Sequence, residues 1–350
     1  MEMPLVSVIV PLYNAENFIG DLIGSCLVQT LENFELIIVD DCSTDKSREV
    51  VESYIPKSSG RLKLIKMFAN TGGPALPRNK GLEISRGKYI FFADNDDALT
   101  YNALEQFYRI AEKYRADVLN CRRYFKTSGS DEEFAKNLEL HGDPNDNKIE
   151  QVVEDTGKRL RAWMKNSFEI TPWTKFCRRD FLVENEIKFP PVVQEDSVWT
   201  FELICTARRI FMIPNAVYIH RVRKDSFGSV SLKREVTSDG VRRKFERIIC
   251  GLKDIDEFMG RLEFFRENPA LRYRTLSHFV TQNLNWIRVA GGDTEPYVIY
   301  QNLREAFSAE MGGHDVLISF LVANNIRLIK ELIAEREKNK SADSVEGGGD

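Results

Sequence analysis

The sequence lacks the features that assign many proteins to a class at first sight. It contains no run of 18 or more consecutive apolar residues, so no membrane-spanning helix is expected. The first ten residues have no basic segment and lead directly into an apolar, strand-like run, unlike a secretory signal peptide. Basic residues are not in excess, with 49 Lys and Arg against 53 Asp and Glu and a net charge of −4. Nucleic acid is therefore not an expected partner, because phosphate binding favours a basic surface.

Cysteine is sparse as well. The six cysteines form no C-x-x-C pair, so we expect reduced thiols in the core or in loops and no zinc site. Together with the missing signal peptide, this predicts a soluble, cytoplasmic protein. The chain is nevertheless long enough for a sizeable core, with 350 residues of which 43% are hydrophobic and 29% charged. Such a length predicts two domains, or one large α/β domain with an appendage.

The first half of the sequence alternates strand-like and helix-like segments. Apolar runs predict four strands, at residues 5–10, 34–39, 62–67 and 88–93. The segments between them predict three helices, at residues 17–29, at residues following Asp45, and at residues 81–86. Ser43 or Thr44 is placed to cap the second of these helices. This alternation predicts an α/β fold whose mostly parallel sheet has helices on both faces.

Polar residues cluster where each predicted strand ends. The four clusters are Tyr13 with Asn14, Asp40 with Asp41, Asn70 to Gly73, and Asp94 to Asp97. A single cluster of this kind is typical of a turn, since Asn, Asp and Gly are the usual turn residues. Four clusters at the carboxyl ends of neighbouring strands predict a ligand site, because ligands bind there in open α/β sheets.

The acidic run Asp94 to Asp97 is the most informative of the four. Carboxylates this close repel one another unless a cation holds them, and oxygen ligands select a hard divalent ion such as Mg²⁺ or Mn²⁺. Because such an ion often takes its remaining ligands from substrate phosphates, a diphosphate ligand is implied. The alternative is an acidic turn in which Asp97 caps the following helix.

Two common phosphate-binding loops are missing. No G-x-G-x-x-G follows the first strand and no G-x-x-x-x-G-K-[ST] occurs, which excludes the simplest dehydrogenase and ATPase assignments. Asp40 and Asp41 still end the second strand, where a carboxylate can accept a hydrogen bond from a ribose hydroxyl or a base N–H. A nucleotidyltransferase, the first alternative enzyme, should have a Gly-rich, basic loop after the first strand, and the sequence has none.

These residues resemble the family 2 glycosyltransferases, which have the GT-A fold. The shared motifs, in the order and spacing of the family, are PLYN (11–14), VDDCSTD (39–45), NTGG (70–73), PRNKG (77–81) and DNDD (94–97). The resemblance is strong over residues 4–125 and continues more loosely to about residue 232. Its later elements are TPWTKFCRRDFL (171–182), QEDSVWTFEL (194–203) and YIHRVRKDSFGSVS (218–231). Two residues depart from the family pattern: Cys42 replaces a usual Gly, and Pro77 replaces a small residue.

The resemblance implies a metal-dependent, inverting transfer from a UDP-sugar. Asp41 would contact the uracil, Asp94 the ribose, and Asp96 the Mn²⁺ or Mg²⁺ between the diphosphate oxygens. Further donor-site residues implied in this way are Pro11, Tyr13, Asn14, Asn70, Gly73, Arg78, Asn95, Trp173 and Lys175, although Trp173 is equally a candidate for the core. The acceptor would be a hydroxyl of a saccharide or lipid-linked saccharide in surface polysaccharide synthesis.

The later motifs imply the catalytic base and a further metal ligand. Asp196 would be the base, with Glu195 as the alternative; on sequence alone the pair is typical of an acidic first turn of a helix. His220 matches a histidine that ligates the metal in some relatives, whereas a strand histidine is otherwise usually a packed core residue. Arg221 and Arg223 beside it are placed to meet phosphate charge, or else lie on a solvated strand face.

The resemblance also divides the chain. We expect a GT-A domain over residues 1–232 with a polar insertion at about 127–150, a helical C-terminal region over 233–338, and a disordered tail over 339–350. The helical region would contribute to the acceptor site or to a homo-oligomer contact. A basic, apolar helix at 326–340 is a candidate for peripheral contact with the inner face of the membrane, or it packs on its own domain. A non-catalytic GT-A fold that binds a nucleotide-sugar or a partner transferase remains the second alternative.

Overall fold

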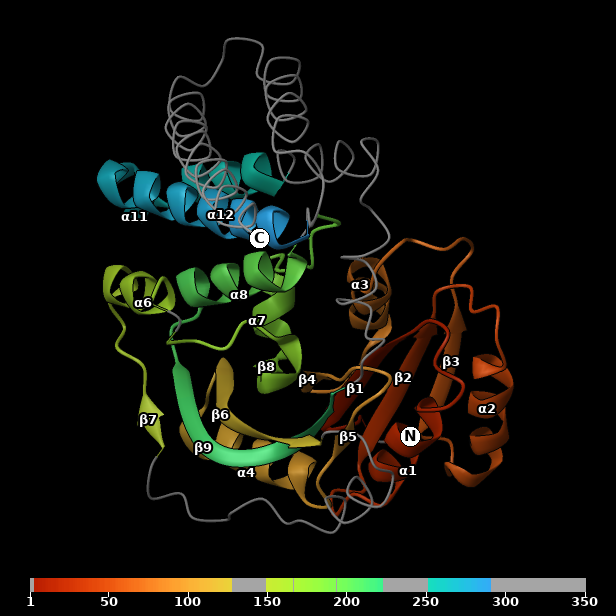
Figure 1. Ribbon diagram of the computed structural model, residues 1–350. Helices are drawn as coiled ribbons and strands as arrows, with labels where there is room; N and C mark the ends of the chain where they lie inside the picture. Colours follow the sequence, from red (N-terminus) through yellow and green to blue (C-terminus); the bar gives the residue numbers. More distant parts are fainter. Residues whose placement is uncertain (1–2, 128–148, 166, 193, 223–250, 291–350) are drawn as a thin grey trace, which may run out of the picture. The chain divides into compact units, whose positions relative to one another are not determined.

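The computed structural model describes residues 3–127, 149–165, 167–192, 194–222 and 251–290 (Figure 1). The chain divides into two units, residues 1–224 and 225–350. Most of the predicted polar insertion, the predicted domain boundary at 232, the helix at 326–340 and the tail from 339 lie outside the described residues. Those boundaries therefore remain predictions.

Four parallel strands form the first half of the central sheet. They are β1 (Val6–Leu12), β2 (Phe34–Asp40), β3 (Leu62–Lys66) and β4 (Tyr89–Phe92), arranged in the order β3-β2-β1-β4. Every residue of β1, β2 and β4 is buried, as the uninterrupted apolar runs predict. β1 extends through Pro11, which the sequence placed after the strand. Proline is tolerated there because β4 pairs only with residues 6–9 of β1.

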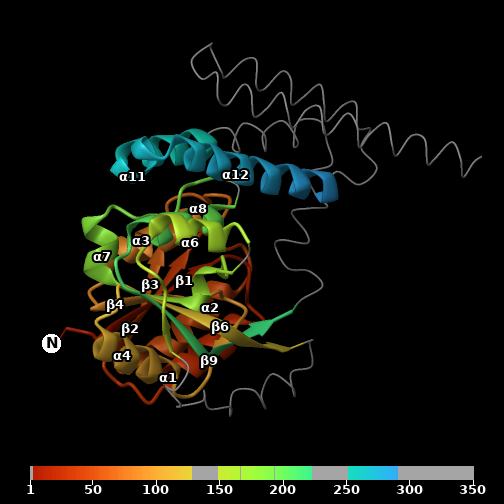
Figure 2. The same cartoon turned by 90° about the vertical axis from the view of Figure 1, so that its left-hand side faces the viewer.

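Helices connect these strands and cover both faces of the sheet. They are α1 (Ile19–Leu27), α2 (Ser47–Tyr54) with the short 3₁₀ turn η1 (Ile55–Lys57), and α3 (Ala75–Ile84). α3 begins six residues before the predicted segment, because Pro77 lies in its first turn, where proline needs no hydrogen-bond partner for its nitrogen. Figures 1 and 2 show α3 on one side of the sheet and α1 on the other.

The second half of the sheet mixes strand directions. Its elements are β5 (Ala98–Leu99), α4 (Ala103–Tyr114), β6 (Val118–Thr127), β7 (Glu150–Gln151), α6 (Thr156–Trp163), η3 (Pro172–Thr174), β8 (Lys175–Arg178), α7 (Arg179–Glu184), α8 (Glu195–Thr206) and β9 (Ile210–Arg221). β8 runs antiparallel between β4 and β6, while β9 is parallel to β6 and antiparallel to β5 and β7. The α/β prediction is confirmed; the sheet as a whole is mixed, and parallel pairing dominates only in its first half.

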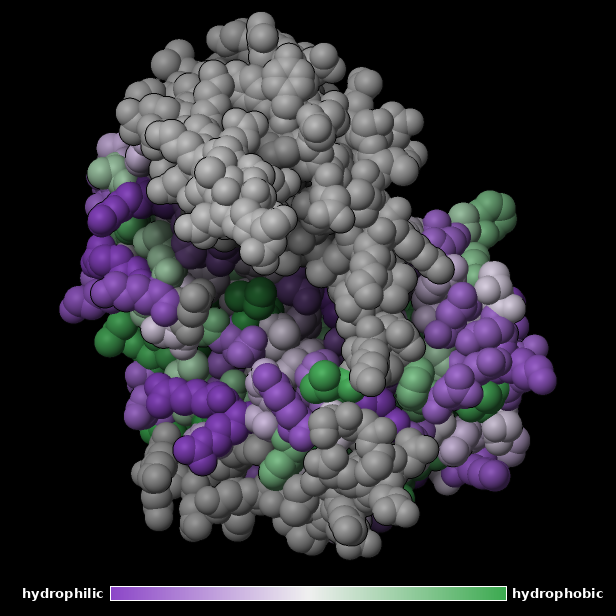
Figure 3. Space-filling model, viewed as in Figure 1, coloured by the Kyte–Doolittle hydropathy of each residue, from purple (hydrophilic) through white to green (hydrophobic). Residues whose placement is uncertain are grey.

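The described part of the C-terminal unit is helical, as predicted. Residues 251–261 are helical, followed by α11 (Glu263–Glu267) and α12 (Pro269–Ala290). An ion pair of 2.7 Å between Arg272 and Asp256 joins α12 to the helix at residues 251–261. Within the described ranges, no helix combines the length and the hydropathy that crossing a bilayer requires. Among the coloured, described residues of the face shown in Figure 3, polar side chains predominate, with smaller hydrophobic patches between them.

Two glycines provide a test of how α3 packs on the sheet. A Cβ added at Gly81 in α3 would overlap the Cγ2 atom of Ile9 in β1, whereas one added at Gly24 in α1 would meet no atom within 4 Å. We expect Gly81→Ala to lower the free energy of unfolding by about 1–3 kcal/mol, the usual cost of overpacking. Gly24→Ala should raise it by about 0.5–1 kcal/mol, because alanine loses less entropy in a helix. Urea unfolding curves of both variants test this, and equal effects would contradict the close approach of α3 to β1.

Candidate active site

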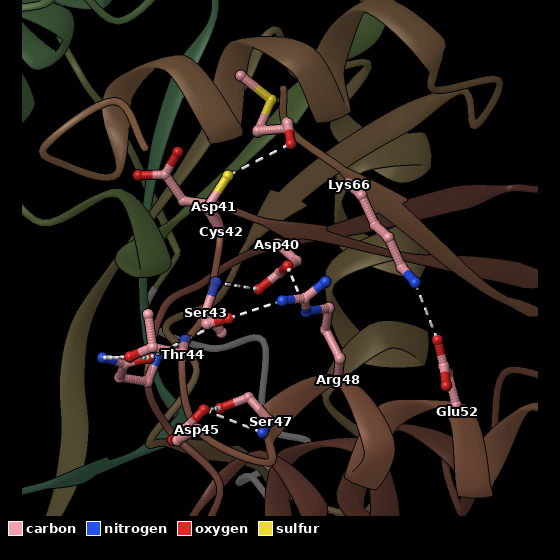
Figure 4. Close-up of polar contacts among 12 residues, drawn as sticks. Asp40, Asp41, Cys42, Ser43, Thr44, Asp45, Ser47, Arg48, Glu52 and Lys66 are labelled. Carbon is pink, nitrogen blue, oxygen red and sulfur yellow. Dashed lines mark hydrogen bonds and ion pairs between the residues drawn. The ribbon is translucent and has the colours of Figure 1, made fainter. Parts of the chain in front are cut away.

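The two aspartates at the end of β2 have different surroundings. Asp40 is buried, accepts a hydrogen bond of 3.0 Å from the Ser43 backbone N–H and pairs with Arg48 at 3.3 Å. The carboxylate of Asp41 points away from this network (Figure 4) and accepts hydrogen bonds of 2.9 and 3.0 Å from the Thr71 backbone N–H and 3.0 Å from its hydroxyl. Burial raises the pKa of Asp41, and the Thr71 hydrogen bonds oppose that shift. Asp40 is thus a structural residue, while Asp41 is hydrogen-bonded to a second loop.

That second loop is residues 70–73. The Asn70 side-chain amide donates to the Asp41 carbonyl at 2.8 Å and accepts from the Gly72 N–H at 3.1 Å. Gly72, with φ of +77°, is the residue that needs glycine, since this conformation is disfavoured for other residues. Gly73 contributes a carbonyl that accepts from the Thr71 hydroxyl at 3.2 Å. The sequence included all of residues 70–73 in a predicted ligand-binding cluster but assigned donor contacts to Asn70 and Gly73 alone; the contacts of Thr71 and the conformation of Gly72 are added by the structure.

Asn14 fastens the end of β1 to the loop after β2. It has a left-handed backbone with φ of 46°, and its side chain accepts from the Thr44 N–H at 2.8 Å and donates to the Thr44 hydroxyl at 3.1 Å. Its own N–H donates to the Ser43 hydroxyl at 3.1 Å. The prediction that Ser43 or Thr44 caps α2 is wrong, because both hydroxyls serve Asn14 and α2 begins at Ser47. The N-cap of α2 is Lys46, which makes no side-chain capping bond, and the preceding Asp45 accepts from the Ser47 N–H at 3.0 Å (Figure 4).

Cys42, which departs from the family pattern, has a backbone conformation that favours glycine and a thiol contact that glycine could not make. Its φ of 64° lies in the left-handed region, which costs a residue with a Cβ roughly 1–2 kcal/mol and which glycine adopts freely. The thiol donates to the Met67 carbonyl at 3.4 Å, which ties the β2 loop to the end of β3 (Figure 4). A glycine at this position would satisfy the same backbone without that contact.

The acidic run after β4 is braced by β9. The Asp94 N–H donates to the Tyr218 hydroxyl at 2.9 Å, and the Asn95 amide donates to the Pro11 carbonyl at 3.0 Å. Asp97 is fully buried and accepts from the Arg221 N–H at 2.8 Å, so the interpretation of Asp97 as a cap of the following helix is wrong. The Arg221 guanidinium donates to the Asp96 carbonyl at 3.1 Å and to Asp21 at 2.6 Å. Arg221 is therefore buried, so the alternative that it lies on a solvated strand face is wrong, and a contact with phosphate stays a prediction; Arg223 lies outside the described residues.

His220 is held by Asp97 and by an aromatic stack. Its Nδ1 lies 3.2 and 3.3 Å from the two carboxylate oxygens of Asp97, and this hydrogen bond raises the pKa of His220. The ring stacks on Trp173 at 5.3 Å, and Trp173 stacks in turn on Tyr218 at 4.6 Å. Trp173 is only 4% exposed, so the structure favours the core alternative for it.

Arg78 joins three carboxylates from two motifs. Its Nη1 lies 2.6 Å from Asp196 and 3.5 Å from Glu195, and its Nη2 lies 2.9 Å from Asp94. The arginine itself is 3% exposed, whereas the side chains of Asp94, Glu195 and Asp196 keep 34%, 18% and 28% of their surface. The three acids are thus accessible from solvent, and the cation that holds them is not.

The surroundings of Asp196 change its acidity. Burial raises its pKa to about 7; Glu195 and Asp94 add to the shift, and Arg78 and Lys175 oppose it. Lys175 is itself buried, and its ammonium donates to the carbonyls of Glu169 and Thr171 at 2.5 and 3.0 Å and to the Thr174 hydroxyl at 3.2 Å. Burial lowers its pKa to about 8. In this geometry Lys175 fixes the loop at 169–174, and a contact of Lys175 with a ligand remains a prediction.

The carboxyl ends of β1, β2 and β4 therefore carry three groups of side chains. One is Asp41 with residues 70–73, one is Arg78 with its carboxylates, and one is Asp97 with His220 and Arg221. Tyr218 links the last two groups through Asp94. Tyr13 lies at the same edge, where 42% of its surface is exposed.

Comparison with known proteins adds a family. The model of glycosyl transferase family 2 matches residues 7–184, just over half of the chain. The chain belongs to this family.

Among its relatives, the family member EpsJ of Bacillus subtilis, an uncharacterized glycosyltransferase, is 31% identical over 233 residues, which cover 66% of this chain and 65% of EpsJ. The Staphylococcus aureus poly(ribitol-phosphate) β-N-acetylglucosaminyltransferase TarS is 30% identical over 223 residues, which cover 63% of this chain and 36% of TarS. The chain thus spans about one third to two thirds of the length of the curated relatives it matches first.

Solved structures show the same fold. The S. aureus TarS fragment 1–349 in complex with UDP-GlcNAc superposes with a TM-score of 0.64 at 24% identity, covering 95% of this chain and 92% of that one. The mannosyltransferase PcManGT of Pyrobaculum calidifontis, in complex with GDP-Man and Mn²⁺, gives a TM-score of 0.50 at 16% identity, covering 95% and 84%. The family 2 transferase predicted from the motifs thus has the GT-A fold, whose members are typically dependent on a divalent metal.

The acidic edge suits a metal ion whose coordination is completed by oxygens of the substrate. Among the residues that the structure describes, no three His, Cys, Asp or Glu side chains are grouped as a ready-made metal site. Asp96 offers a partly exposed carboxylate, and His220 has Nδ1 on a carboxylate, as metal-ligating histidines usually do. Two protein ligands of this kind fit an ion that takes its remaining oxygens from a diphosphate.

Proposed function

We propose that the protein is an inverting glycosyltransferase that moves a sugar from a UDP-sugar to a hydroxyl of a saccharide or lipid-linked saccharide. The observation that carries this proposal is the grouping of the accessible carboxylates Asp94 and Asp196 on one buried arginine, beside the Asp41 loop. A nucleotide site and a base then lie at one edge of the sheet. The names of relatives that transfer N-acetylglucosamine or glucose to poly(ribitol phosphate) support a surface polysaccharide as the product.

The donor would lie along the ends of β1, β2 and β4. Asp41 and the backbone of residues 70–73 offer acceptors and donors to the uracil, and Asp94 offers a carboxylate to the ribose. Asp96 and His220 would hold Mn²⁺ or Mg²⁺ against the diphosphate. When bound there, the ion neutralises charge on the leaving diphosphate.

The transfer needs a base on the other side of the sugar. Asp196 takes the proton of the acceptor hydroxyl while the oxygen of that hydroxyl forms a bond to the anomeric carbon. The bond from that carbon to the diphosphate breaks and releases UDP. With a pKa of about 7, Asp196 is a stronger base than an exposed aspartate and is still about half ionised at neutral pH. Glu195 lies in the same first turn of α8 and is the alternative base.

The release of UDP tests the proposal. The protein is incubated with Mn²⁺ and a panel of UDP-sugars that includes UDP-GlcNAc and UDP-glucose, with and without poly(ribitol phosphate) or oligosaccharide acceptors. We expect UDP release from at least one donor, accelerated by an acceptor, and no release of GDP when GDP-mannose is supplied instead. A non-catalytic protein would bind a nucleotide-sugar without releasing UDP.

The rate should depend on pH through Asp196. Because burial raises the pKa of Asp196 to about 7, the base is protonated below that pH, and kcat should rise as the pH passes from 6 to 8. The groups that face it are Glu195 and Asp94, which raise its pKa, and Arg78 and Lys175, which lower it. Initial rates at saturating donor give the profile, and UDP affinity measured at each pH separates binding from the chemical step. A rate that stays constant from pH 5 to 8 would contradict Asp196 as the base.

The acceptor decides where the protein works. A saccharide acceptor would let it act in the cytoplasm, while a lipid-linked acceptor would require peripheral contact with the inner face of the membrane. Sedimentation of the protein with vesicles that carry a lipid-linked saccharide would separate the two acceptor classes.

A further inference from the structure

Two adjacent residues of α3, Arg78 and Asn79, contact the segment that leads to the proposed base Asp196. Arg78 binds Asp196 and Glu195, which lie 118 and 117 positions further along the chain, and it also binds Asp94 at the end of β4. The neighbouring Asn79 accepts from the Phe189 N–H at 2.8 Å and donates to the Phe189 carbonyl at 2.7 Å. Two adjacent side chains of one helix thus fix both ends of the segment 189–196.

The geometry of Arg78 differs from that of a diphosphate contact. Both of its Nη atoms are already used by carboxylates, and its Nε is buried without a hydrogen-bond partner among the described residues. The guanidinium lies 5.1 Å from the centre of the Phe189 ring, and only 3% of the residue is exposed. A donor phosphate would therefore meet the carboxylates before it met Arg78.

The charge balance makes this one cation important. Three carboxylates surround Arg78, and the other cation that acts on Asp196 is Lys175, whose ammonium is used by oxygens of its own loop. A planar guanidinium can bond two carboxylates in fixed directions at once, which a single ammonium on a flexible stem cannot do with the same geometry. Arginine at this position therefore sets distances as well as charge.

We propose that Arg78 is a positioning residue that holds the base Asp196 and the donor-site residue Asp94 on the two arms of one guanidinium. This inference rests on the proposed function, because it assigns the base and the ribose contact as that proposal does. It replaces the direct donor contact that the sequence resemblance implies for Arg78. The loop after β4 and the start of α8 are then fixed relative to each other before any ligand binds.

Two substitutions separate geometry from charge. Arg78→Lys keeps the charge and loses the two-armed contact, so kcat should fall about tenfold or more while the midpoint of the pH profile stays near its original value. Arg78→Met removes the charge as well, so that midpoint should move up by about one pH unit, because an opposite charge lowers a carboxyl pKa by about that amount or more. UDP affinity with Mn²⁺ should fall by only about threefold in both variants, because Asp94 loses the arm that positions it for the ribose, whereas the larger loss falls on the chemical step. The control is Lys80→Met on the same helix, whose ammonium pairs at 3.0 Å with Glu83, a residue to which no part of the site is assigned.

The experiment measures kcat against pH, the calorimetric affinity for UDP with Mn²⁺, and the thermal unfolding of all four proteins. A fall in kcat clearly larger than the fall in UDP affinity, together with the upward shift in Arg78→Met, supports the proposal. A loss of UDP affinity in parallel with kcat would overturn it in favour of a donor contact, and an equal loss at every pH in Arg78→Met would overturn it in favour of a purely structural role. If Arg78→Met does not fold, the division between kcat and affinity in Arg78→Lys decides.

Failure of the proposed function gives a different result. In that case the wild-type protein releases no UDP from any donor, and the role of Arg78 is judged from unfolding alone. The urea midpoint should then fall less on Arg78→Met in an Asp196→Asn background than in the wild type, because one uncompensated carboxylate is already gone. Additive effects of the two substitutions on the urea midpoint would contradict the proposed role of Arg78 in holding Asp196.

Discussion

Asp196→Asn should reduce sugar transfer by about 10³-fold, within the usual range for loss of a general base, with UDP affinity almost unchanged. The substitution keeps the shape of the side chain and removes the oxygen that takes the proton of the acceptor. Asp196 lies on Arg78, 2.6 Å from its Nη1, and no donor contact is assigned to it. Initial rates of UDP release at saturating donor and acceptor, and calorimetry of UDP with Mn²⁺, measure the two quantities separately.

Glu195→Gln is the matched control. Glu195 is the neighbouring acid in the first turn of α8 and lies 3.5 Å from the same Nη1. Its removal should reduce transfer by roughly tenfold or less, because it acts on the pKa of Asp196 and takes no proton itself. The reverse order, with Glu195→Gln nearly inactive and Asp196→Asn active, would assign the base to Glu195.

Asp96→Ala should weaken the binding of UDP in the presence of Mn²⁺ by about 10–100-fold, the usual effect of disturbing a metal site. Asp96 carries a partly exposed carboxylate in the acidic run after β4, next to Asp97, which pairs with His220. Binding of UDP without metal should be weak in both the wild type and the variant. Titration of UDP at saturating Mn²⁺ and in the presence of a chelator gives all four values.

A suitable control acid is Glu83 in α3. Its carboxylate pairs with Lys80 and is 66% exposed, away from the strand ends that carry the site. Glu83→Gln should bind UDP like the wild type with or without Mn²⁺. An Asp96→Ala variant that also binds UDP like the wild type would remove Asp96 from the metal site.

Much of the fold could be predicted from the sequence because its signals are local. Buried parallel strands appear as apolar runs, and the polar clusters that follow them mark the carboxyl ends of the strands. The motifs also placed Asp94 and Asp196 in one site. Helix α3 was predicted too short, because Pro77 and Gly81 obscure a helix whose proline lies in the first turn and whose glycine packs against Ile9.

The parts that escaped prediction depend on contacts distant in sequence. Nothing local to Arg78 indicates that it will bond Asp94 and Asp196 together. The pKa of Asp196 follows from burial among groups of several loops, so the sequence suggests only the ordinary aspartate value of about 3.9. Asp97 resembles its acidic neighbours in sequence, and only the folded β9 shows that it is buried against His220.

Trp173 and Lys175, which the resemblance places at the donor, have supporting contacts within the protein. Trp173 is nearly buried and stacks between Tyr218 and His220, so it orients the histidine from within the core. The Lys175 ammonium holds three oxygens of the loop at 169–174. Both residues stabilise neighbouring parts of the site, and a direct contact of either with the donor stays a prediction.

The central claim is that the edge formed by Asp41, Asp94 and Asp96 binds the nucleotide of a UDP-sugar together with a divalent ion. Calorimetric titration of UDP, GDP, CDP and dTDP, each with and without Mn²⁺, tests it most directly. We expect tight binding of UDP only, and only with the metal present. Absence of binding by all four nucleotides under both conditions would contradict the claim.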